Sequence, residues 1–330
     1  VIVPHKGILS VHNIEYQFEK FSGNKKINTL KISILSDKDK TTFIKYGSDI
    51  MHMHNTISHV ELKGKQYVRN DRTMMIESVD DRVLSKDKNE RVMIDYLGSE
   101  LYGTTLHDFT FEKQIDVFED IDKIIVFPFA SIYNLGINKD WGIAHIKNLH
   151  EIKYNADAFD CLVLEERKKI LIKSLINNKN KVDKYKDFID HKGGGLVFLL
   201  YGSPGLGKSL TVEAISEHMH APLYSINCGD LGVNPSTLED VMNDILVYTK
   251  RWNALILIDE VDVFIEERIA ADIVRNAMVG IFLKLLEYND SIIFLTTNRL
   301  TSIDSAIKSR INLMLSYKDL DIEKRAQIWK

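Results

Sequence analysis

The pattern of apolar and polar residues changes partway along the chain. From residue 196 onward, runs of consecutive apolar residues alternate with longer segments in which apolar residues recur at helical spacing. The runs predict strands at 196–201, 223–227, 254–258 and 291–296, and the longer segments predict helices at 210–220, 238–250 and 270–288. Strands buried on both faces read as continuous apolar runs, so this alternation predicts an α/β domain with a parallel sheet and helices on both of its faces.

Two local patterns add detail to the helices. An amphipathic helix is expected after residue 162, where the apolar positions at helical spacing are Leu164, Ile170, Leu171, Leu175 and Ile176. The Lys- and Asn-rich stretch 177–186 then predicts an exposed loop. Further on, Ser236-Thr237-Leu238-Glu239 fits a capping box, which predicts that the helix 238–250 begins there.

The earlier part of the chain reads as short strands with alternating apolar and polar positions. The predicted strands are 11–18, 30–35, 41–46, 59–68, 73–79 and 91–97. Gly64 predicts a β-hairpin within 61–68. We therefore expect two domains. A mainly β domain at 1–154, with a possible substrate- or partner-binding role, precedes the α/β domain at 155–330.

Composition and charge narrow the class of protein. The 330 residues are 45% hydrophobic and 27% charged, which is typical of a soluble globular protein. A net charge of −4 gives no general basic field for nucleic acid, and no apolar run approaches the ~20 residues of a membrane-spanning helix. Cys161 and Cys228 form no C-x-x-C pair and suit a reducing, intracellular compartment, with the cytoplasm as the default. The chain begins on Val1 and reads as a fragment, so a targeting segment upstream stays open.

The loop after the strand 196–201 carries a phosphate-binding pattern. Residues 202–209 fit G-x-x-x-x-G-K-[ST], in which glycines let several backbone N–H groups converge on phosphate oxygens. Lys208 is expected to reach the β- and γ-phosphates, and the Ser209 hydroxyl is expected to bind Mg²⁺. The expected nucleotide-binding residues are Gly202, Ser203, Pro204, Gly205, Leu206, Gly207, Lys208, Ser209 and Leu210.

Two acids follow the next central strand. Asp259 and Glu260 come directly after Leu255-Ile256-Leu257-Ile258, at the carboxyl end of a strand, where open α/β sheets bind ligands. We expect Asp259 to hold Mg²⁺ and Glu260 to take a proton from an attacking water. A hydrolase needs such an acid and a kinase does not, so hydrolysis of a nucleoside triphosphate is the predicted reaction.

Two further polar residues complete the predicted site. Asn298 follows the strand 291–296 and is placed to orient the attacking water against the γ-phosphate. Arg310 ends Asp304-Ser305-Ala306-Ile307-Lys308-Ser309-Arg310 and is expected to reach the γ-phosphate of a neighbouring subunit. Where such arginine fingers have been removed, the rate falls by about 10³–10⁵.

Three patterns have competing interpretations. Asn180-Lys181-Val182-Asp183 matches the guanine-reading N-K-x-D motif, but Asp259 is followed by Glu-Val-Asp and not by the D-x-x-G of a GTPase, so ATP is favoured. A soft-metal site is one interpretation of Met51-His52-Met53-His54, because a strand would place His52 and His54 on the same face. No third ligand fits the pattern, so solvent-exposed histidines on a strand are the favoured interpretation. Gly193-Gly194-Gly195 either lets the backbone approach the adenine or forms a plain turn.

In their order and spacing, four motifs resemble those of the AAA ATPases. They are residues 202–209, 255–260, 296–299 and 304–310, the last of which is similar to the second region of homology of that family. The resemblance implies a P-loop NTPase core in a homo-oligomeric, usually hexameric, ring that remodels a macromolecule. It also implies the roles given above for Lys208, Ser209, Asp259, Glu260 and Asn298, and for Arg310 as the finger in trans.

A narrower likeness extends upstream to a branch of AAA proteins common in fungi, which carry an N-terminal domain of unknown function. It rests on Trp141-Gly142 and on residues 152–160 and 193–200, with Arg91-Val92-Met93-Ile94-Asp95-Tyr96 similar to that N-terminal domain.

Three departures from the family pattern qualify these expectations. Ser203 and Ser209 stand where Pro and Thr are usual. The connection 228–235 is short and lacks the aromatic pore-loop residue of protein-threading rings. The chain also ends soon after Arg310, so most of the helical lid is expected to be missing. The prediction is an ATP-hydrolysing remodelling machine; the alternative is an assembly switch or clamp-loader-like scaffold, which the Ser309-Arg310 pair also resembles.

Overall fold

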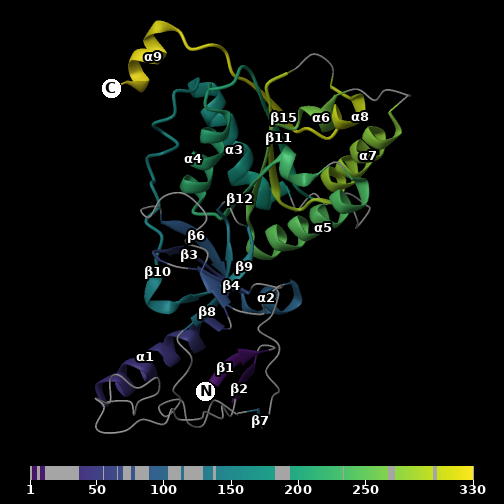
Figure 1. Cartoon of the computed structure of the whole chain (residues 1–330). Helices are drawn as coiled ribbons and strands as arrows, with labels where there is room; N and C mark the ends of the chain where they lie inside the picture. Colours follow the sequence, from purple (N-terminus) through teal and green to yellow (C-terminus); the bar gives the residue numbers. More distant parts are fainter. Residues whose placement is uncertain are drawn as a thin grey trace. The chain divides into compact units, whose positions relative to one another are not determined.

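The structure is a computed structural model in which two parts of the chain form separate compact units, Val1–Ile152 and Lys153–Lys330 (Figure 1). It describes residues 2–5, 8–11, 37–54, 56–64, 66–69, 76–78, 89–102, 113–114, 129–136, 139–182, 194–232, 234–266, 272–299 and 303–329. Within these residues, no helix combines the length and the apolar character that crossing a bilayer requires.

The second unit is built on a five-stranded sheet in the order β12-β13-β14-β11-β15, with every neighbouring pair parallel. Its strands are β11 (Leu196–Tyr201), β12 (Leu223–Asn227), β13 (Leu255–Asp259), β14 (Ile292–Thr297) and β15 (Leu313–Ser316). Three of the predicted runs are therefore the inner strands β11, β13 and β14, whereas 223–227 is the edge strand β12; β14 is buried along its whole length. The parallel α/β sheet is confirmed.

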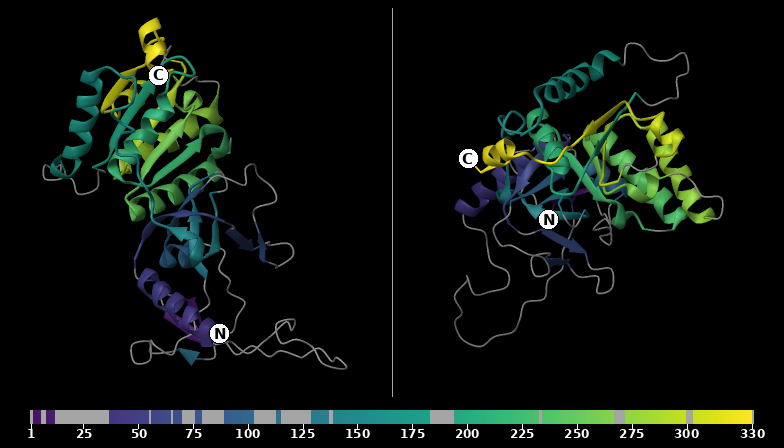
Figure 2. Two further views of the ribbon diagram at one scale, coloured as in Figure 1. Left: turned by 90° about the vertical axis from the view of Figure 1, so that its left-hand side faces the viewer. Right: turned by 90° about the horizontal axis from the view of Figure 1, so that it is seen from above.

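Helices cover both faces of this sheet, as Figure 1 and Figure 2 show. The helices of this unit are α3 (Glu166–Val182), α4 (Lys208–Met219), α5 (Pro235–Trp252), α6 (Asp262–Ile265), α7 (Ile273–Tyr288), α8 (Ser305–Lys308) and α9 (Ile322–Ile328), with a 3-10 turn at Cys228–Leu231. Helix α9 has no buried residue and lies away from the sheet (Figure 1). Alternate strand residues serve the two faces. Phe198 and Phe294, for example, belong to the core that α3 and α4 close with Ile172 and Val212.

Three helix predictions were wrong in detail. Helix α5 begins at Pro235, because the Asn234 side chain accepts a hydrogen bond from the Ser236 N–H and caps the helix a turn earlier than the capping-box pattern indicated. Helix α3 continues to Val182, into the stretch predicted as loop. Its buried positions include Ile172, whereas Ile170 and Leu171 are 57% and 41% exposed.

The first unit is a seven-stranded antiparallel sheet in the order β10-β3-β6-β8-β9-β4-β5, with a separate three-stranded sheet β1-β2-β7. The larger sheet consists of β3 (Ser58–Leu62), β4 (Gln66–Arg69), β5 (Ile76–Ser78), β6 (Glu90–Ile94), β8 (Phe129–Asn134), β9 (Trp141–His145) and β10 (Leu149–His150). The smaller consists of β1 (Ile2–His5), β2 (Ile8–Val11) and β7 (Lys113–Gln114). The other elements are α1 (Asp37–His54), α2 (Tyr96–Tyr102) and the 3-10 turn Ile146–Asn148.

Several strand predictions in this unit were wrong. Residues 41–46 and the Met51–His54 motif lie in α1, so His52 and His54 are not on one face of a strand. No group of three or more metal-ligating side chains occurs among the residues that the structure describes. Strands β3 and β4 do not pair as a hairpin, because β3 pairs with β6 and β10 while β4 pairs with β5 and β9. Residues 12–18 and 30–35 lie outside the described residues.

Candidate active site

The phosphate loop links β11 to α4 with three glycines at positive φ. Gly205 and Gly207 have φ of 78° and 84°, and nothing among the described residues lies within 4 Å of where their side chains would begin. Gly202 has φ of 147°, and a Cβ on it would meet the backbone oxygen of Tyr317 at 2.3 Å. The loop therefore needs glycine for backbone angle at two positions and for close approach as well at the third.

Lys208 begins α4 and points its ammonium group into this loop. Its Nζ donates to the carbonyl oxygens of Gly202 and Ser203, at 2.7 and 2.9 Å, and to Oδ1 of Asn298 at 2.7 Å. Burial lowers the pKa of Lys208, while the charges of Asp259, Asp262 and Glu260 act in the opposite direction. The structure thus joins two of the predicted residues, Lys208 and Asn298, directly.

Ser209 and Asp259 also meet across the end of the sheet. The Ser209 hydroxyl donates to Oδ2 of Asp259 at 2.9 Å. The other carboxylate oxygen of Asp259 accepts from the Thr296 hydroxyl, and that hydroxyl accepts from the Glu260 N–H at 3.1 Å. One buried threonine on β14 therefore fixes both acids that follow β13. Hydroxyl and carboxylate oxygens are the hard ligands that Mg²⁺ prefers, so Ser209 and Asp259 fit this cation.

Glu260 has an unusual backbone. Its φ of 57° lies in the left-handed region, which non-glycine residues rarely occupy. Its exposed side chain lies near Asn227, whose Nδ2 donates to Oε2 of Glu260 at 3.5 Å. Asn227 ends β12 and is paired in register with Asp259 of the adjacent strand. The left-handed turn therefore carries the carboxylate of Glu260 away from the strand, where solvent and Asn227 reach it.

Arg310 is not joined to these residues within the chain. It follows α8, and its Nη1 donates to the Ala306 carbonyl at 3.0 Å while Nη2 pairs with Oε2 of Glu287 at 2.7 Å. Of the remaining predicted nucleotide-binding residues, Ser203 and Pro204 are exposed, Leu206 is half-buried and Leu210 is 57% exposed.

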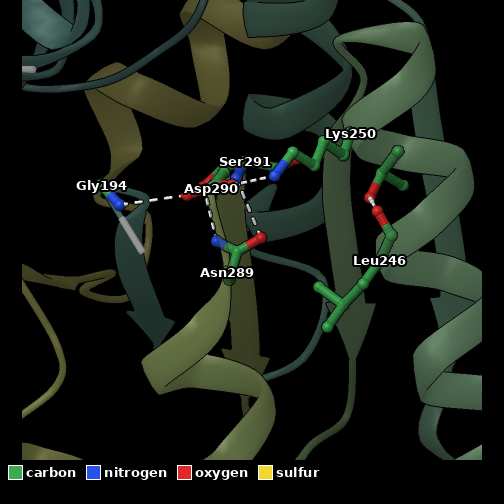
Figure 3. Close-up of polar contacts among 7 residues, drawn as sticks. Gly194, Leu246, Lys250, Asn289, Asp290 and Ser291 are labelled. Carbon is green, nitrogen blue, oxygen red and sulfur yellow. Dashed lines mark hydrogen bonds and ion pairs between the residues drawn. The ribbon is translucent and has the colours of Figure 1, made fainter. Parts of the chain in front are cut away.

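The glycines before β11 lie at the opposite edge of the sheet from the phosphate loop. Gly195 N–H donates to the Asn289 carbonyl at 3.0 Å, and a Cβ on Gly195 would lie 2.5 Å from that oxygen. Gly194 N–H and the Lys250 ammonium both donate to Asp290, at 3.3 and 2.6 Å (Figure 3). Their close approach is therefore to the turn between α7 and β14. These contacts are those of a structural turn, and an approach of Gly194 and Gly195 to the adenine stays a prediction.

Three residues of this site were missed from the sequence. Thr296 and Asn227 lie at the carboxyl ends of β14 and β12, the two strands beside β13, and a polar residue at that position was the available signal. Tyr317 follows β15; its N–H donates to the Tyr201 carbonyl at 2.8 Å, and its hydroxyl donates to Oγ1 of Thr211 on α4 at 2.8 Å. No local pattern marks Tyr317, because its contacts depend on the pairing of β15 with β11.

Comparison with known proteins bears on the same part of the chain. The family model "ATPase family associated with various cellular activities (AAA)" matches residues 198–317. The AAA-ATPase At1g43910 of Arabidopsis thaliana is 31% identical over 135 residues, which cover 36% of this chain and 26% of that protein. The 26S proteasome regulatory subunit 6B homolog of Encephalitozoon cuniculi is 29% identical over 122 residues, 33% of this chain and 31% of that protein. The chain thus spans less than a third of the length of these two relatives.

Among solved structures, the FIGL-1 AAA domain in complex with ADP matches with a TM-score of 0.42 and 21% identity, over 54% of this chain and 61% of that one. The family model begins within β11 and ends at Tyr317, so it spans the phosphate loop, the acidic strand end and Arg310. Residues 198–317 are therefore similar in sequence to the ATPase domain of the AAA family.

Proposed function

We propose that this protein binds ATP with Mg²⁺, hydrolyses the β–γ phosphoanhydride, and uses the cycle to remodel a macromolecular partner within a homo-oligomeric ring. One observation carries the proposal. The cation and the hydroxyl at the start of α4, Lys208 and Ser209, lie within hydrogen-bond distance of Asn298 and Asp259 at the ends of two neighbouring strands. This arrangement brings together a phosphate-binding cation, a pair of Mg²⁺ ligands and a polar strand-end residue.

Phosphate binding requires Lys208 to exchange partners. An ammonium group has three N–H donors, and all three have acceptors in the structure, Gly202, Ser203 and Asn298. A phosphate oxygen at this position replaces at least one of them. If the Asn298 contact is the one exchanged, the Asn298 amide is released to hold the attacking water. The N–H groups of the loop and the amino-terminal end of α4 supply further positive charge to the phosphates.

Ser209 Oγ and a carboxylate oxygen of Asp259 would hold Mg²⁺. When bound, Mg²⁺ supplies positive charge that neutralises the phosphate oxygens as negative charge develops on them. The hydrogen bond from Thr296 holds Asp259 in place for this role, and the N–H of Glu260 is fixed by the same hydroxyl.

Glu260 is the proposed general base. Its exposed carboxylate, directly after β13, takes a proton from water at Oε1 or Oε2, while the water oxygen attacks the γ-phosphorus and ADP leaves. Asn227, which donates to Oε2, orients the carboxylate. Arg310 of a neighbouring subunit stabilises the charge that develops on the transferred phosphoryl group.

The partner and the setting belong to the same proposal. The first unit, as the domain 1–154, binds the partner, and the AAA domain 155–330 changes conformation with nucleotide state. The net charge of −4 gives no reason to choose nucleic acid as the partner. The exposed Cys161 and the half-buried Cys228 are both free thiols, which favours a reducing, cytoplasmic setting.

The direct test is ATP turnover by Glu260→Gln in the full-length protein. Loss of the carboxylate is expected to lower kcat by about 10²–10⁴, as for other general bases, with ATP binding retained. Glu239→Gln is the matched control, because Glu239 pairs with Lys284 on the exposed surface between α5 and α7 and is expected to keep full activity. Undiminished turnover in Glu260→Gln would rule out the assigned base.

A second candidate function is an ATP-dependent assembly switch or clamp-loader-like scaffold that threads no substrate. The short connection after β12 favours it, because a 3-10 turn at Cys228–Leu231 is followed closely by α5 at Pro235, with no aromatic residue between. Steady hydrolysis by the assembled protein supports the remodelling machine. An assembled ring that binds ATP without turnover supports the switch.

A further inference from the structure

The side chain proposed as the finger in trans is held by its own subunit. Arg310 comes two residues after α8, a short helix that Asp304 caps by accepting from the Ala306 N–H at 2.9 Å. Asp304 is 5% exposed, and its N–H donates to the Ile265 carbonyl at the end of α6, at 2.8 Å. The backbone that leads to Arg310 is therefore anchored to the segment that follows the acidic strand β13.

The guanidinium group is held at two of its three nitrogens. Nη1 donates to the Ala306 carbonyl at 3.0 Å, and Nη2 pairs with Oε2 of Glu287, near the end of α7, at 2.7 Å. Nε is buried and has no hydrogen-bond partner among the described residues. The side chains of Arg310 and Glu287 keep 29% and 33% of their surface exposed, so the group is fixed from one side and open on another.

We propose that Glu287 is a positioning residue for Arg310: its carboxylate holds the guanidinium so that the remaining Nη hydrogens face the nucleotide of the next subunit. The inference rests on the finger role proposed above. An arginine side chain has many rotamers, and fixing one of them before assembly removes an entropic cost from the transition state. A guanidinium has five N–H donors, so one contact each to Ala306 and Glu287 leaves both Nη atoms a hydrogen for phosphate oxygens.

The geometry is better suited to aiming the group than to stabilising the fold. A carboxylate placed beside Nε and Nη2 together would form a bidentate pair and satisfy both nitrogens. Of these two nitrogens, only Nη2 receives the Glu287 carboxylate, and the Nε–H stays buried without a partner among the described residues, which costs stability. A partly exposed single contact of this kind contributes little to folding, so its position next to the proposed finger needs another explanation.

The test compares Glu287→Ala and Glu287→Gln with Arg310→Ala in the full chain. Loss of the Glu287 carboxylate is expected to lower kcat for ATP about 10- to 100-fold, with little change in KM, because the neighbour's nucleotide still binds but the finger is misplaced. In the Arg310→Ala background the same substitution is expected to change nothing further. Glu239→Ala is the control and is expected to keep full turnover. Glu239 lies on α5 and pairs with Lys284, which lies on α7 as Glu287 does.

Mixed rings separate positioning from damage to the fold. A Glu287→Ala subunit keeps an intact nucleotide site, and a Glu260→Gln subunit keeps an intact finger, so turnover is expected to return when the two are mixed. Activity that stays low in mixed rings, or a Glu287→Ala loss that persists in the Arg310→Ala background, overturns the positioning role. Full activity in Glu287→Ala together with a loss in Arg310→Ala also overturns the positioning role of Glu287, but remains consistent with Arg310 as the finger. Full activity in Arg310→Ala overturns the finger and this inference together.

Discussion

Two glycines of the phosphate loop and one glycine of helix α7 give glycine-to-alanine substitutions with different expected outcomes. In Gly202→Ala the new methyl carbon would lie 2.3 Å from the Tyr317 carbonyl oxygen and 3.0 Å from the Tyr317 Cβ. In Gly205→Ala it would meet nothing within 4 Å among the described residues, although φ is 78°. Gly280 lies on the exposed side of α7, and a Cβ there also meets nothing. Gly202→Ala therefore reports the cost of a steric clash together with backbone strain, Gly205→Ala reports backbone strain alone, and Gly280→Ala reports helix propensity.

The expected magnitudes follow from these contacts. At Gly202 a φ of 147° is open almost only to glycine, at about 1–3 kcal/mol for any other residue. Crowding against a backbone atom that cannot rotate away adds about 1–3 kcal/mol, so the free energy of unfolding is expected to fall by about 2–6 kcal/mol. Gly205→Ala has only the left-handed strain, about 1–2 kcal/mol. Gly280→Ala is expected to stabilise the protein by about 0.5–1 kcal/mol, because alanine favours a helix.

Denaturant unfolding measures the order of stability, and hydrogen–deuterium exchange locates the damage. Tyr317 N–H donates to the Tyr201 carbonyl at 2.8 Å, next to Gly202, so its exchange is expected to accelerate in Gly202→Ala and not in Gly205→Ala. Both loop variants are expected to bind ATP weakly, so binding does not discriminate between them. Equal unfolding midpoints and equal exchange at Tyr317 for the two variants would refute the claimed close approach of β15 to the loop.

Three further predictions concern half-buried side chains. Burial, with the charges of Asp262 and Glu260, raises the pKa of Cys228 to about 11. Iodoacetamide at pH 8 is therefore expected to alkylate the exposed Cys161 well before Cys228. Mass spectrometry of the peptides measures the order of alkylation, and the reverse order would contradict the prediction. Burial first, and then the charge of Arg91, lowers the pKa of His59 from 6.5 to about 4, so the unfolded chain binds the proton first as the pH falls. The first unit should therefore lose up to about 3 kcal/mol of stability between pH 6.5 and pH 4, and His59→Gln should flatten that part of the unfolding profile. Tyr317→Phe removes the hydroxyl that donates to Thr211 and is expected to cost about 0.5–1.5 kcal/mol in denaturant unfolding, whereas an unchanged midpoint would show that this hydrogen bond contributes nothing.

The α/β unit was predictable because its signals are local. The inner strands β11, β13 and β14 are runs of mainly apolar residues, and the phosphate loop is a contiguous motif at the end of β11. The carboxyl ends of parallel strands lie at the same end of a sheet, so the sequence alone predicts Asp259 and Asn298 near Lys208. The contacts Lys208–Asn298 and Ser209–Asp259 have that geometry, while the catalytic roles of these residues stay predictions.

The first unit was less predictable because its strands pair with partners that are far away in the sequence. Thr41, Thr42 and Phe43 favour a strand by residue type, yet they lie in the 18-residue helix α1. The residues around Gly64 resemble a hairpin, but β4 pairs with β9, more than 70 residues later in the chain, at Gln66 opposite Ala144. Cross-strand partners at that separation leave no mark on the local pattern of apolar residues. The link between Arg310 and Glu287 was hidden for the same reason, since α7 and α8 meet only in the fold.

The left-handed backbone at Glu260 has a consequence for how this domain evolves. Glycine, and to a lesser extent asparagine, adopts a φ of 57° with less strain than glutamate, so the chain keeps a strained residue where a more comfortable one is available. Selection for stability alone would replace it, and the proposed role of Glu260 as general base is the requirement that would oppose this replacement. Descendants of this domain that bind nucleotide without hydrolysing it are therefore expected to accumulate glycine or asparagine at position 260. The residue at position 260 is then expected to indicate whether a lineage still hydrolyses ATP.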